Sequence, residues 1–347
     1  MSEQLHSLVA TVQRNCDISD AHHARNYTLC IYLLKMREYF RWEKGYGFGD
    51  SLPNSELGDW LTAREQLWQE LEGNDFEPIP VDGDHHQPFE ADRINRRLLP
   101  RGLVYSGGIG GFARAHFFLA KLHRQEQRDG CDILIAGEEF ARDLTAPPAM
   151  SLGNTIFVRR QSIRRMLWEK VEEWRWNEAE SPMSRAMAFY PFDEDLDTAL
   201  EAMTEVELEA VVLHEMGESR AGVLLGTHWE RLLEATLQSR SELVLRAARD
   251  HLADCAVTLP QLIREERVPS LHFYFANLAG MRKEIFPSLA EAYRIWCERN
   301  DLSVMRRVVE KGERHWRRLA EELAQLRSDD KEDLKHAIEE RLEKAPL

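Results

Sequence analysis

The sequence lacks the cysteine patterns that hold together small secreted domains and zinc sites. Its five cysteines are odd in number, lie far apart along the chain and never form a Cys-x-x-Cys pair. They therefore indicate neither a disulfide framework nor a zinc site built from thiolates.

Long apolar runs are also missing. No stretch of about 18 apolar residues, the length that crosses a bilayer, occurs anywhere in the chain. Residues 1–15 lack the basic start and the apolar core of a signal peptide. We therefore expect a cytoplasmic protein without a membrane-spanning helix.

Basic residues are fewer than acidic residues in this chain. Lys and Arg number 45 against 60 Asp and Glu, which gives a net charge of −15. Nucleic acids and anionic membranes both attract proteins through basic surfaces, so the composition predicts neither as a partner. Hydrophobic residues make up 43% of the 347 residues, which is enough to bury a substantial core.

The hydrophobic pattern that is present is mostly helical. Apolar residues recur at helical spacing over residues 20–44, over residues 55–72 and over most of the chain after residue 160. Residues 101–158 instead hold short apolar runs, and Asp129-Gly130 between two of them indicates a β-hairpin. We predict a mainly α protein, a multi-helix bundle with a small antiparallel β insert or subdomain, in an α+β arrangement.

The chain then divides into three parts. Residues 1–100 form an N-terminal helical part, residues 101–158 form the small β-containing insert, and residues 159–347 form a C-terminal helical bundle that packs with the N-terminal helices. Pro260 and Pro287 should kink or end their helices, because proline lacks the backbone N–H that a helix interior needs.

The segment from Glu205 to Gly222 carries the most informative polar residues. His214 and Glu218 are four residues apart, so on a helix they project from one face and are able to hold the same metal ion. The zinc-protease motif His-Glu-x-x-His is incomplete, because its last position is Glu218. A solvated or salt-bridged His–Glu pair is the plainer interpretation of the same spacing.

Two further helices carry metal-ligand candidates. His251 and Asp254 are three residues apart at the edge of an apolar stripe, where polar residues also occur for structural reasons. Glu38 and His23 lie on the helix expected over residues 20–44, whose apolar middle is typical of a helix buried between others. Roughly 22 Å of helix separates these two residues, so each would join a different cluster. An ion pair with a neighbouring arginine is the alternative for Glu38.

In composition and placement these residues resemble the ligands of ferritin-like or haem-oxygenase-like dimetal proteins. The familiar pattern is two copies of Glu-x-x-His, whereas this chain has His-x-x-x-Glu and His-x-x-Asp. Oxygen and imidazole ligands suit iron, manganese or zinc. The leading hypothesis is a metal-binding protein, and an enzyme if Glu215 or His23 supports the ligands or acts as an acid–base group.

Two other classes of function stay open. The first is a non-enzymatic interaction or scaffold protein, whose acidic surface and charged C-terminal helix dock a protein partner or a second copy. The second is a nucleotide-binding protein that uses the Gly-x-Gly-x-x-Ala stretch Gly108–Ala113. That function requires the glycines to open a helix, and Glu138 follows the first glycine by 138 − 108 = 30 residues, which is long for the usual ribose contact.

Three stretches of the chain resemble a family of uncharacterised bacterial conserved proteins. They are CDISDAHHARNYTLCIYLLKMREYFRWEKG (16–45), ARDLTAPPAMSLGNTIFVRR (141–160) and LHEMGESRAG (213–222). The resemblance covers nearly the whole chain and implies a bacterial cytoplasmic protein. It implies no activity, cofactor or catalytic residue.

Overall fold

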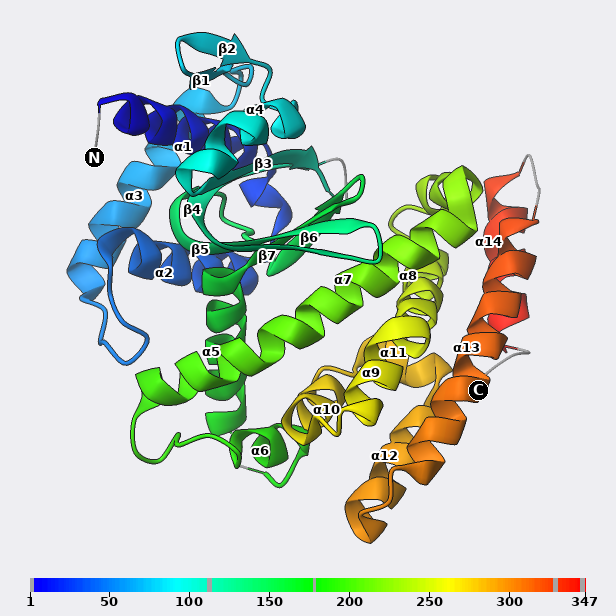
Figure 1. The fold of residues 1–347 in the computed structure, drawn as a ribbon. Helices are drawn as coiled ribbons and strands as arrows, with labels where there is room; N and C mark the ends of the chain where they lie inside the picture. The colour runs from blue at the N-terminus through cyan, green and yellow to red at the C-terminus, as the bar shows by residue number, and fades with distance from the viewer. Residues whose placement is uncertain (1–2, 111–113, 177–178, 327–329, 344–346) are drawn as a thin grey trace. The chain divides into compact units, whose positions relative to one another are not determined.

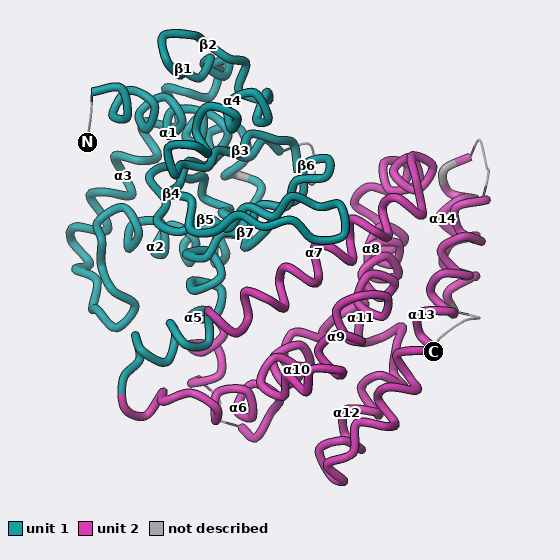
Figure 2. Tube along the Cα trace, in the orientation of Figure 1, with its two compact units in different colours: residues 1–169, 195–204 teal, residues 170–194, 205–347 magenta. Residues whose placement is uncertain are grey.

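The computed structural model describes residues 3–110, 114–176, 179–326, 330–343 and 347. The chain forms two compact units (Figure 2). Unit 1 comprises Met1–Glu169 and Asp195–Thr204, and unit 2 comprises Lys170–Glu194 and Glu205–Leu347. Among the helices that are described, none is both long enough and apolar enough to cross a membrane.

Unit 1 combines helices with two sheets (Figure 1). Its helices are α1 (Glu3–His23), α2 (Leu29–Lys44), α3 (Asn54–Leu71) and α4 (Ala91–Leu98), with short 3-10 turns η1 (Ala24–Asn26) and η2 (Leu99–Arg101). Its strands are β1 (Ile79–Val81), β2 (Asp84–His86), β3 (Leu103–Ile109), β4 (Ala115–Arg128), β5 (Cys131–Arg142), β6 (Ala149–Leu152) and β7 (Thr155–Arg159). Helices α5 (Arg160–Arg175) and α7 (Leu196–Ala235) begin in unit 1 and continue into unit 2.

The larger sheet has five strands in the order β3-β4-β5-β7-β6. The hairpin predicted at Asp129-Gly130 is confirmed, because Arg128 pairs with Cys131 and both turn residues have positive φ, as a tight two-residue hairpin turn requires. The prediction of an antiparallel insert is wrong in one respect. Strand β7 runs parallel to β5, so the sheet is mixed, and this pairing joins strands that no short turn connects.

Helices and strands of unit 1 share their core. Side chains of β4 alternate between the two faces of the sheet: Phe117 packs with Val12 of α1 and Ile94 of α4, whereas Phe118 packs with Phe157 of β7. Helices α1 and α4 therefore cover one face of the sheet (Figure 1). The strands of the predicted insert belong to the same compact unit as the N-terminal helices.

The single helix expected over residues 20–44 is wrong, because α1 ends at His23 and α2 begins at Leu29. Tertiary contacts explain the break. Arg114 Nη1 donates to the Tyr27 hydroxyl at 2.6 Å, and this hydroxyl also lies 2.9 Å from Thr145 Oγ1, which fixes Tyr27 in extended backbone. The expected burial is also wrong at the start of α2, where several apolar side chains are exposed: Leu29, Ile31, Leu33 and Leu34.

Among its described residues, unit 2 contains helices and no strands. Besides most of α7 it contains α6 (Pro182–Met187), α8 (Arg240–Ala253), the π-helical turn η4 (Asp254–Thr258), α9 (Leu259–Arg264), α10 (Val268–Ala276), α11 (Gly280–Ile285), α12 (Pro287–Arg299), α13 (Ser303–Ala324) and α14 (Lys331–Glu343). Pro287 opens α12 after a break at Phe286, which confirms that it ends the longer helix expected there. Pro260 lies in the first turn of α9, directly after the π-helical turn η4, and the helical run from Arg240 to Arg264 continues through it. A mainly helical α+β protein is thus confirmed.

Candidate functional site

Three of the predicted metal ligands meet in unit 2, where α7 packs against the end of α8. His214 Nδ1 lies 2.9 Å from Asp254 Oδ1, and His214 Nε2 lies 3.6 Å from Glu218 Oε1. Asp254 is completely buried, whereas His214 and Glu218 are half-buried. The helical spacing therefore does place His214 and Glu218 side by side, as the sequence predicts.

A glycine allows the two helices to come this close. A Cβ atom added to Gly217 would lie 2.7 Å from the carbonyl oxygen of Ala253, a separation that real Cβ atoms do not reach. Since Gly217 lies between His214 and Glu218 on α7, the close backbone approach brings His214 to Asp254 and Glu218 to Arg249 of α8.

Arginine side chains already form ion pairs with the carboxylates of this group. Arg249 Nη2 lies 3.1 Å from both oxygens of Glu218. Asp254 Oδ2 accepts hydrogen bonds from the Tyr274 hydroxyl at 2.9 Å and from Arg282 Nη2. We call the set the His214 cluster, which consists of His214, Glu218, Arg249, Asp250, Asp254, Tyr274 and Arg282.

The pKa values in the His214 cluster follow from these contacts. Burial alone would raise the pKa of Asp254 and of Glu218, but Arg282 and His214 hold that of Asp254 below its usual range, and His214 and Arg249 lower that of Glu218 to about 2. In return, Asp254 and Glu218 outweigh the burial of His214 and raise its pKa. Burial and the nearby Glu218 raise the pKa of Asp250 to about 6. The cluster is a network of ion pairs around a protonated histidine.

His251 has contacts of a different kind. Its Nε2 lies 2.7 Å from the carbonyl oxygen of Arg282, so this nitrogen is the donor, and its ring stacks on Trp316 and meets Phe286 edge-on. Burial and Arg282 lower the pKa of His251 to about 4. His251 is thus a neutral histidine packed among aromatic rings.

The other predicted site residues are also accounted for. Glu38 and His23 belong to unit 1. Glu38 pairs with Arg37 Nε at 2.8 Å and with Arg41 Nε at 3.3 Å, as the alternative interpretation expected. His23 ends α1, and partial burial and Arg114 lower its pKa. Glu215 is half-buried on α7, about 100° around the helix from His214.

Within the described ranges, no group of three or more His, Cys, Asp or Glu residues is placed to hold a metal ion. The glycine stretch that was expected to bind a nucleotide joins β3 to the antiparallel strand β4. Its residues 111–113 lie outside the described residues. The described residues that follow, from 115 onward, form a strand and not the helix that a dinucleotide site needs.

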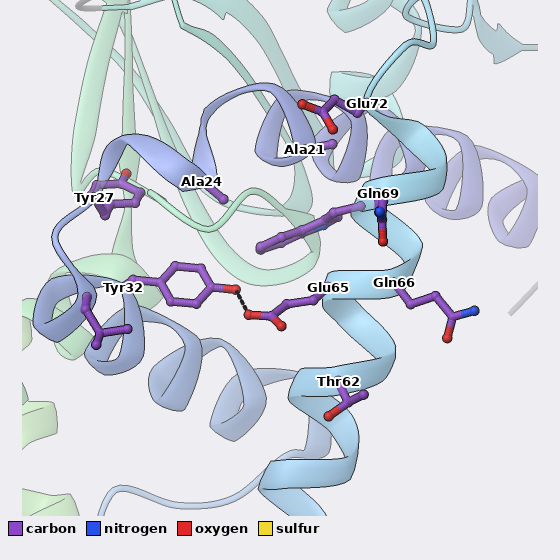
Figure 3. A pocket seen from close by; sticks show the side chains of 11 residues that line it. Ala21, Ala24, Tyr27, Tyr32, Thr62, Glu65, Gln66, Gln69 and Glu72 are labelled. Atoms are coloured by element: carbon purple, nitrogen blue, oxygen red, sulfur yellow. Dashed lines mark hydrogen bonds between the residues drawn. The ribbon is translucent and has the colours of Figure 1, made fainter.

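Sequence analysis missed three cavities that described residues of unit 1 line, two of which lie against α2. The larger of these two, of about 770 Å³, lies among the end of α1, the start of α2 and the second half of α3. Figure 3 shows Tyr32 of α2 and Glu65 of α3 reaching toward each other, and the Tyr32 hydroxyl donates to Glu65 Oε1 at 3.0 Å. Trp68, which also lines the cavity, donates to Asp17 at 3.3 Å. These polar groups of the cavity are bonded to partners within the protein.

The smaller cavity, of about 260 Å³, has a very different wall. It lies at the end of α2, the loop after it, the last residue of β5, the first turns of α5 and the start of α7. We call it the arginine pocket, because Arg41, Arg142, Arg164 and Arg165 line it together with Glu38, Trp42, Gly45, Tyr46, Gly47, Phe48, Gln161 and Asp197. Its charged lining residues are four arginines against two carboxylates.

The arginine pocket contains buried donors without acceptors. Within the described part of the chain, no hydrogen-bond partner exists for the Nε atoms of Arg41, Arg164 and Arg165 or for Nε and Nη2 of Arg142. Arg142 is only 2% exposed, and its guanidinium lies 4.8 Å from the ring centre of Trp42 and 5.4 Å from that of Tyr39. Burial and nearby Arg165 lower the pKa of Arg142 to about 10.

Other buried arginines of unit 1 do have carboxylate partners. Arg159 of β7 forms a bidentate ion pair with Glu139, with Nε–Oε1 at 3.0 Å and Nη2–Oε2 at 2.7 Å. Arg114 pairs with Asp20 at 2.6 Å. Arg142 forms no ion pair of its own among the residues that the structure describes, and the Glu139 carboxylate that acts on its pKa is already paired with Arg159. A buried guanidinium without its counter-ion is the unusual feature of this unit, since buried charges are ordinarily paired.

A sequence signal for this pocket exists but is weak. Arg142 ends a largely buried strand, an unusual place for an unpaired charge, and Arg164-Arg165 follow in the next helix. Glu38 and Arg41 come from about a hundred residues earlier, so only the fold joins them to Arg142.

Comparisons with known proteins identify the family of the chain but no activity. Residues 7–159 match the model of the N-terminal domain, and residues 164–345 that of the C-terminal domain, of a family of unknown function, DUF6866. No curated protein and no solved structure matches the chain. The expected likeness to an uncharacterised family is confirmed, and any function must come from the geometry.

Proposed function

The chain belongs to the DUF6866 family, whose function is unknown, and we propose that its unit 1 binds a small oxyanion in the arginine pocket. One observation carries this proposal: the guanidinium of Arg142 is buried at the pocket without a carboxylate partner in the described protein. Phosphate, sulfate and carboxylate are the anions that guanidinium groups bind best, through paired N–H donors.

Energetics support an anion and not water in this place. A buried donor that finds no acceptor costs about 1–3 kcal/mol. Of the five donors without a hydrogen bond, Arg41 Nε and Arg165 Nε have carboxylate oxygens at 3.3 Å and 3.6 Å, whereas Arg164 Nε and the two atoms of Arg142 have no such contact. Water molecules satisfy donors but leave the positive charge in place, whereas an anion does both. The four lining arginines exceed the two lining carboxylates by two charges, which matches the charge of a doubly ionised oxyanion.

The size of the pocket limits the ligand. Cavities for drug-sized ligands range from about 300 to 1,000 Å³, and the arginine pocket, at 260 Å³, is smaller. A free oxyanion or a very small organic acid fits this volume better than a nucleotide.

A thermal-shift measurement tests the proposal. Phosphate, sulfate and acetate are added to the full chain at constant ionic strength. An anion at about 100 times its Kd stabilises the folded state by about 2.7 kcal/mol, which raises the melting temperature of a unit of this size by roughly 5–10 °C. Arg142→Met should abolish the shift and still fold, because it replaces an unpaired buried charge with an apolar side chain of similar length.

The control is Arg93→Met, which removes an arginine that is exposed on α4. It should keep the full anion-dependent shift. If no anion stabilises the wild type, or if Arg142→Met keeps the shift, the proposed function is wrong.

The second candidate function is metal binding at the His214 cluster, supported by the meeting of His214, Glu218 and Asp254. A metal ion would have to replace Arg249 and Arg282 as the carboxylates' partners, and donor atoms would have to move inward to about 2 Å from the ion. Elemental mass spectrometry of untagged protein tests whether the His214 cluster binds a metal ion. Bound iron, manganese or zinc that His214→Ala removes supports the site, and no metal after reconstitution counts against it.

A further inference from the structure

We infer that the arginine pocket selects an oxyanion that still carries a proton, inorganic phosphate above all, and that Glu38 makes this selection. The inference rests on the proposed function of unit 1 and names the class of its ligand. Its starting point is the one acidic side chain that is deeply buried in the wall of the pocket.

One carboxylate oxygen of Glu38 has an ion-pair contact but no hydrogen bond. Its side chain is 2% exposed, and its Oε1 accepts a hydrogen bond from Arg37 Nε at 2.8 Å. Its Oε2 lies 3.3 Å from Arg41 Nε without the geometry of a hydrogen bond, and it is a buried acceptor that no donor of the described residues satisfies. The wall of the pocket therefore presents several unsatisfied donors and a single unsatisfied acceptor.

Asp197, the other lining carboxylate, does not play this part. Its Oδ1 accepts a hydrogen bond from Arg164 Nη2 at 2.8 Å, and its side chain is 64% exposed to solvent. Water is able to satisfy its remaining acceptor sites. Glu38 has no such access, so its Oε2 requires a donor that comes with the ligand.

Phosphate and sulfate differ in this respect. Both are tetrahedral and present oxygen acceptors to the arginines, but at neutral pH phosphate keeps at least one proton and sulfate keeps none. A bound hydrogen phosphate donates this proton to Glu38 Oε2 in a hydrogen bond while its other oxygens accept from the guanidinium groups. A sulfate instead places an acceptor against a carboxylate, which leaves Oε2 unsatisfied and adds repulsion between like charges.

Phosphate esters are weaker candidates for the same reason. Their second pKa is near 6, so most of an ester has lost its last proton at neutral pH and meets Glu38 as sulfate does. Carboxylates are ionised as well and bring no proton. The small volume of the pocket, 260 Å³, also favours the free anion over an ester.

Isothermal titration calorimetry of the full chain tests the inference, with phosphate and sulfate at neutral pH and equal ionic strength. An unsatisfied buried acceptor costs about 1–3 kcal/mol, so the wild type should bind phosphate about 5- to 150-fold more tightly than sulfate. In Glu38→Gln the amide is able to donate as well as accept. This variant should bind sulfate more tightly than the wild type does, and the preference for phosphate should fall to about one.

The gain of sulfate binding separates selection by Glu38 from a merely structural role, because a disturbed pocket does not gain a ligand. Glu65→Gln, the same exchange in the larger cavity of unit 1, is the matched control and should keep the wild-type preference. If the wild type binds both anions equally, or if Glu38→Gln loses phosphate without gaining sulfate, this inference is wrong and the proposed function stands. If the wild type binds neither anion, both fail.

Discussion

Arg142 and His214 are both side chains with charges in the protein interior, but only one of them is neutralised there. His214 lies between Asp254 and Glu218, and both carboxylates have an arginine as a further partner. Arg142 has two aromatic rings and no carboxylate partner in the described residues. A satisfied network of this kind stabilises a fold, whereas an unsatisfied charge beside a cavity indicates a ligand.

The ionisation of His214 gives a prediction for stability against pH. Its pKa is raised in the folded state above the value of about 6.5 that an unfolded histidine has. The stabilisation is therefore complete below about pH 6.5 and is lost as the pH rises through the folded pKa. The difference in unfolding free energy between wild type and His214→Gln should shrink as the pH rises.

Urea unfolding at a series of pH values measures this difference. Val223→Ala, at an exposed position on the same helix, is the control, and its difference from wild type should not vary, because neither side chain titrates. A His214→Gln difference that grows with pH would mean that His214 is neutral in the folded protein.

Helix α7 contains a matched pair of glycines that tests the contact between α7 and α8. Gly217→Ala would place a Cβ atom 2.7 Å from the backbone of Ala253, which no side-chain rotation relieves. We expect a loss of about 1–3 kcal/mol, typical of overpacking. Gly222→Ala has open space around it and should stabilise the helix by about 0.5–1 kcal/mol.

Chemical denaturation of both variants measures the two effects. Equal effects of the two substitutions would show that the helices do not approach as closely as the structure describes. If Gly217→Ala pushes the two helices apart, it also weakens the ion pair between His214 and Asp254, since the same close approach brings these residues together.

Sequence predicts those elements whose signals are local. The hairpin at Asp129-Gly130 and the spacing of His214 and Glu218 depend on a few adjacent residues, and both predictions are confirmed. Helix α1 was missed from its start, although Leu5, Leu8 and Val12 have helical spacing there and pack into the core.

Features that depend on distant residues were not predictable in this way. The break before α2 arises from Arg114 and Thr145, which hold Tyr27 at the sheet. The arginines that pair with Glu218 and Asp254, and Arg142, Arg164 and Arg165 of the arginine pocket, come from other helices and strands than the acidic residues they face. Spacing along one helix identified the acidic residues and the histidine but not the cations that neutralise them.

At the scale of the whole molecule, net charge and local charge point in opposite directions. The chain carries −15, and its long-range field repels anions, which argued against nucleic acid as a partner. The arginine pocket has two more positive than negative lining residues, and Arg41, Arg142 and Arg165 among them are buried. Local charge of this kind decides the binding of a small ion, whereas net charge decides the approach of a large polyanion.

The central claim is that unit 1 holds a small oxyanion beside Arg142, and hydrogen exchange of the full chain tests it most directly. With saturating phosphate, amides in residues 38–48 and 139–165, which carry most of the pocket lining, should exchange more slowly. Unit 2 should be unchanged, and the protection should be absent in Arg142→Met. Unchanged exchange in residues 38–48 and 139–165, or protection that persists in Arg142→Met, would contradict the account.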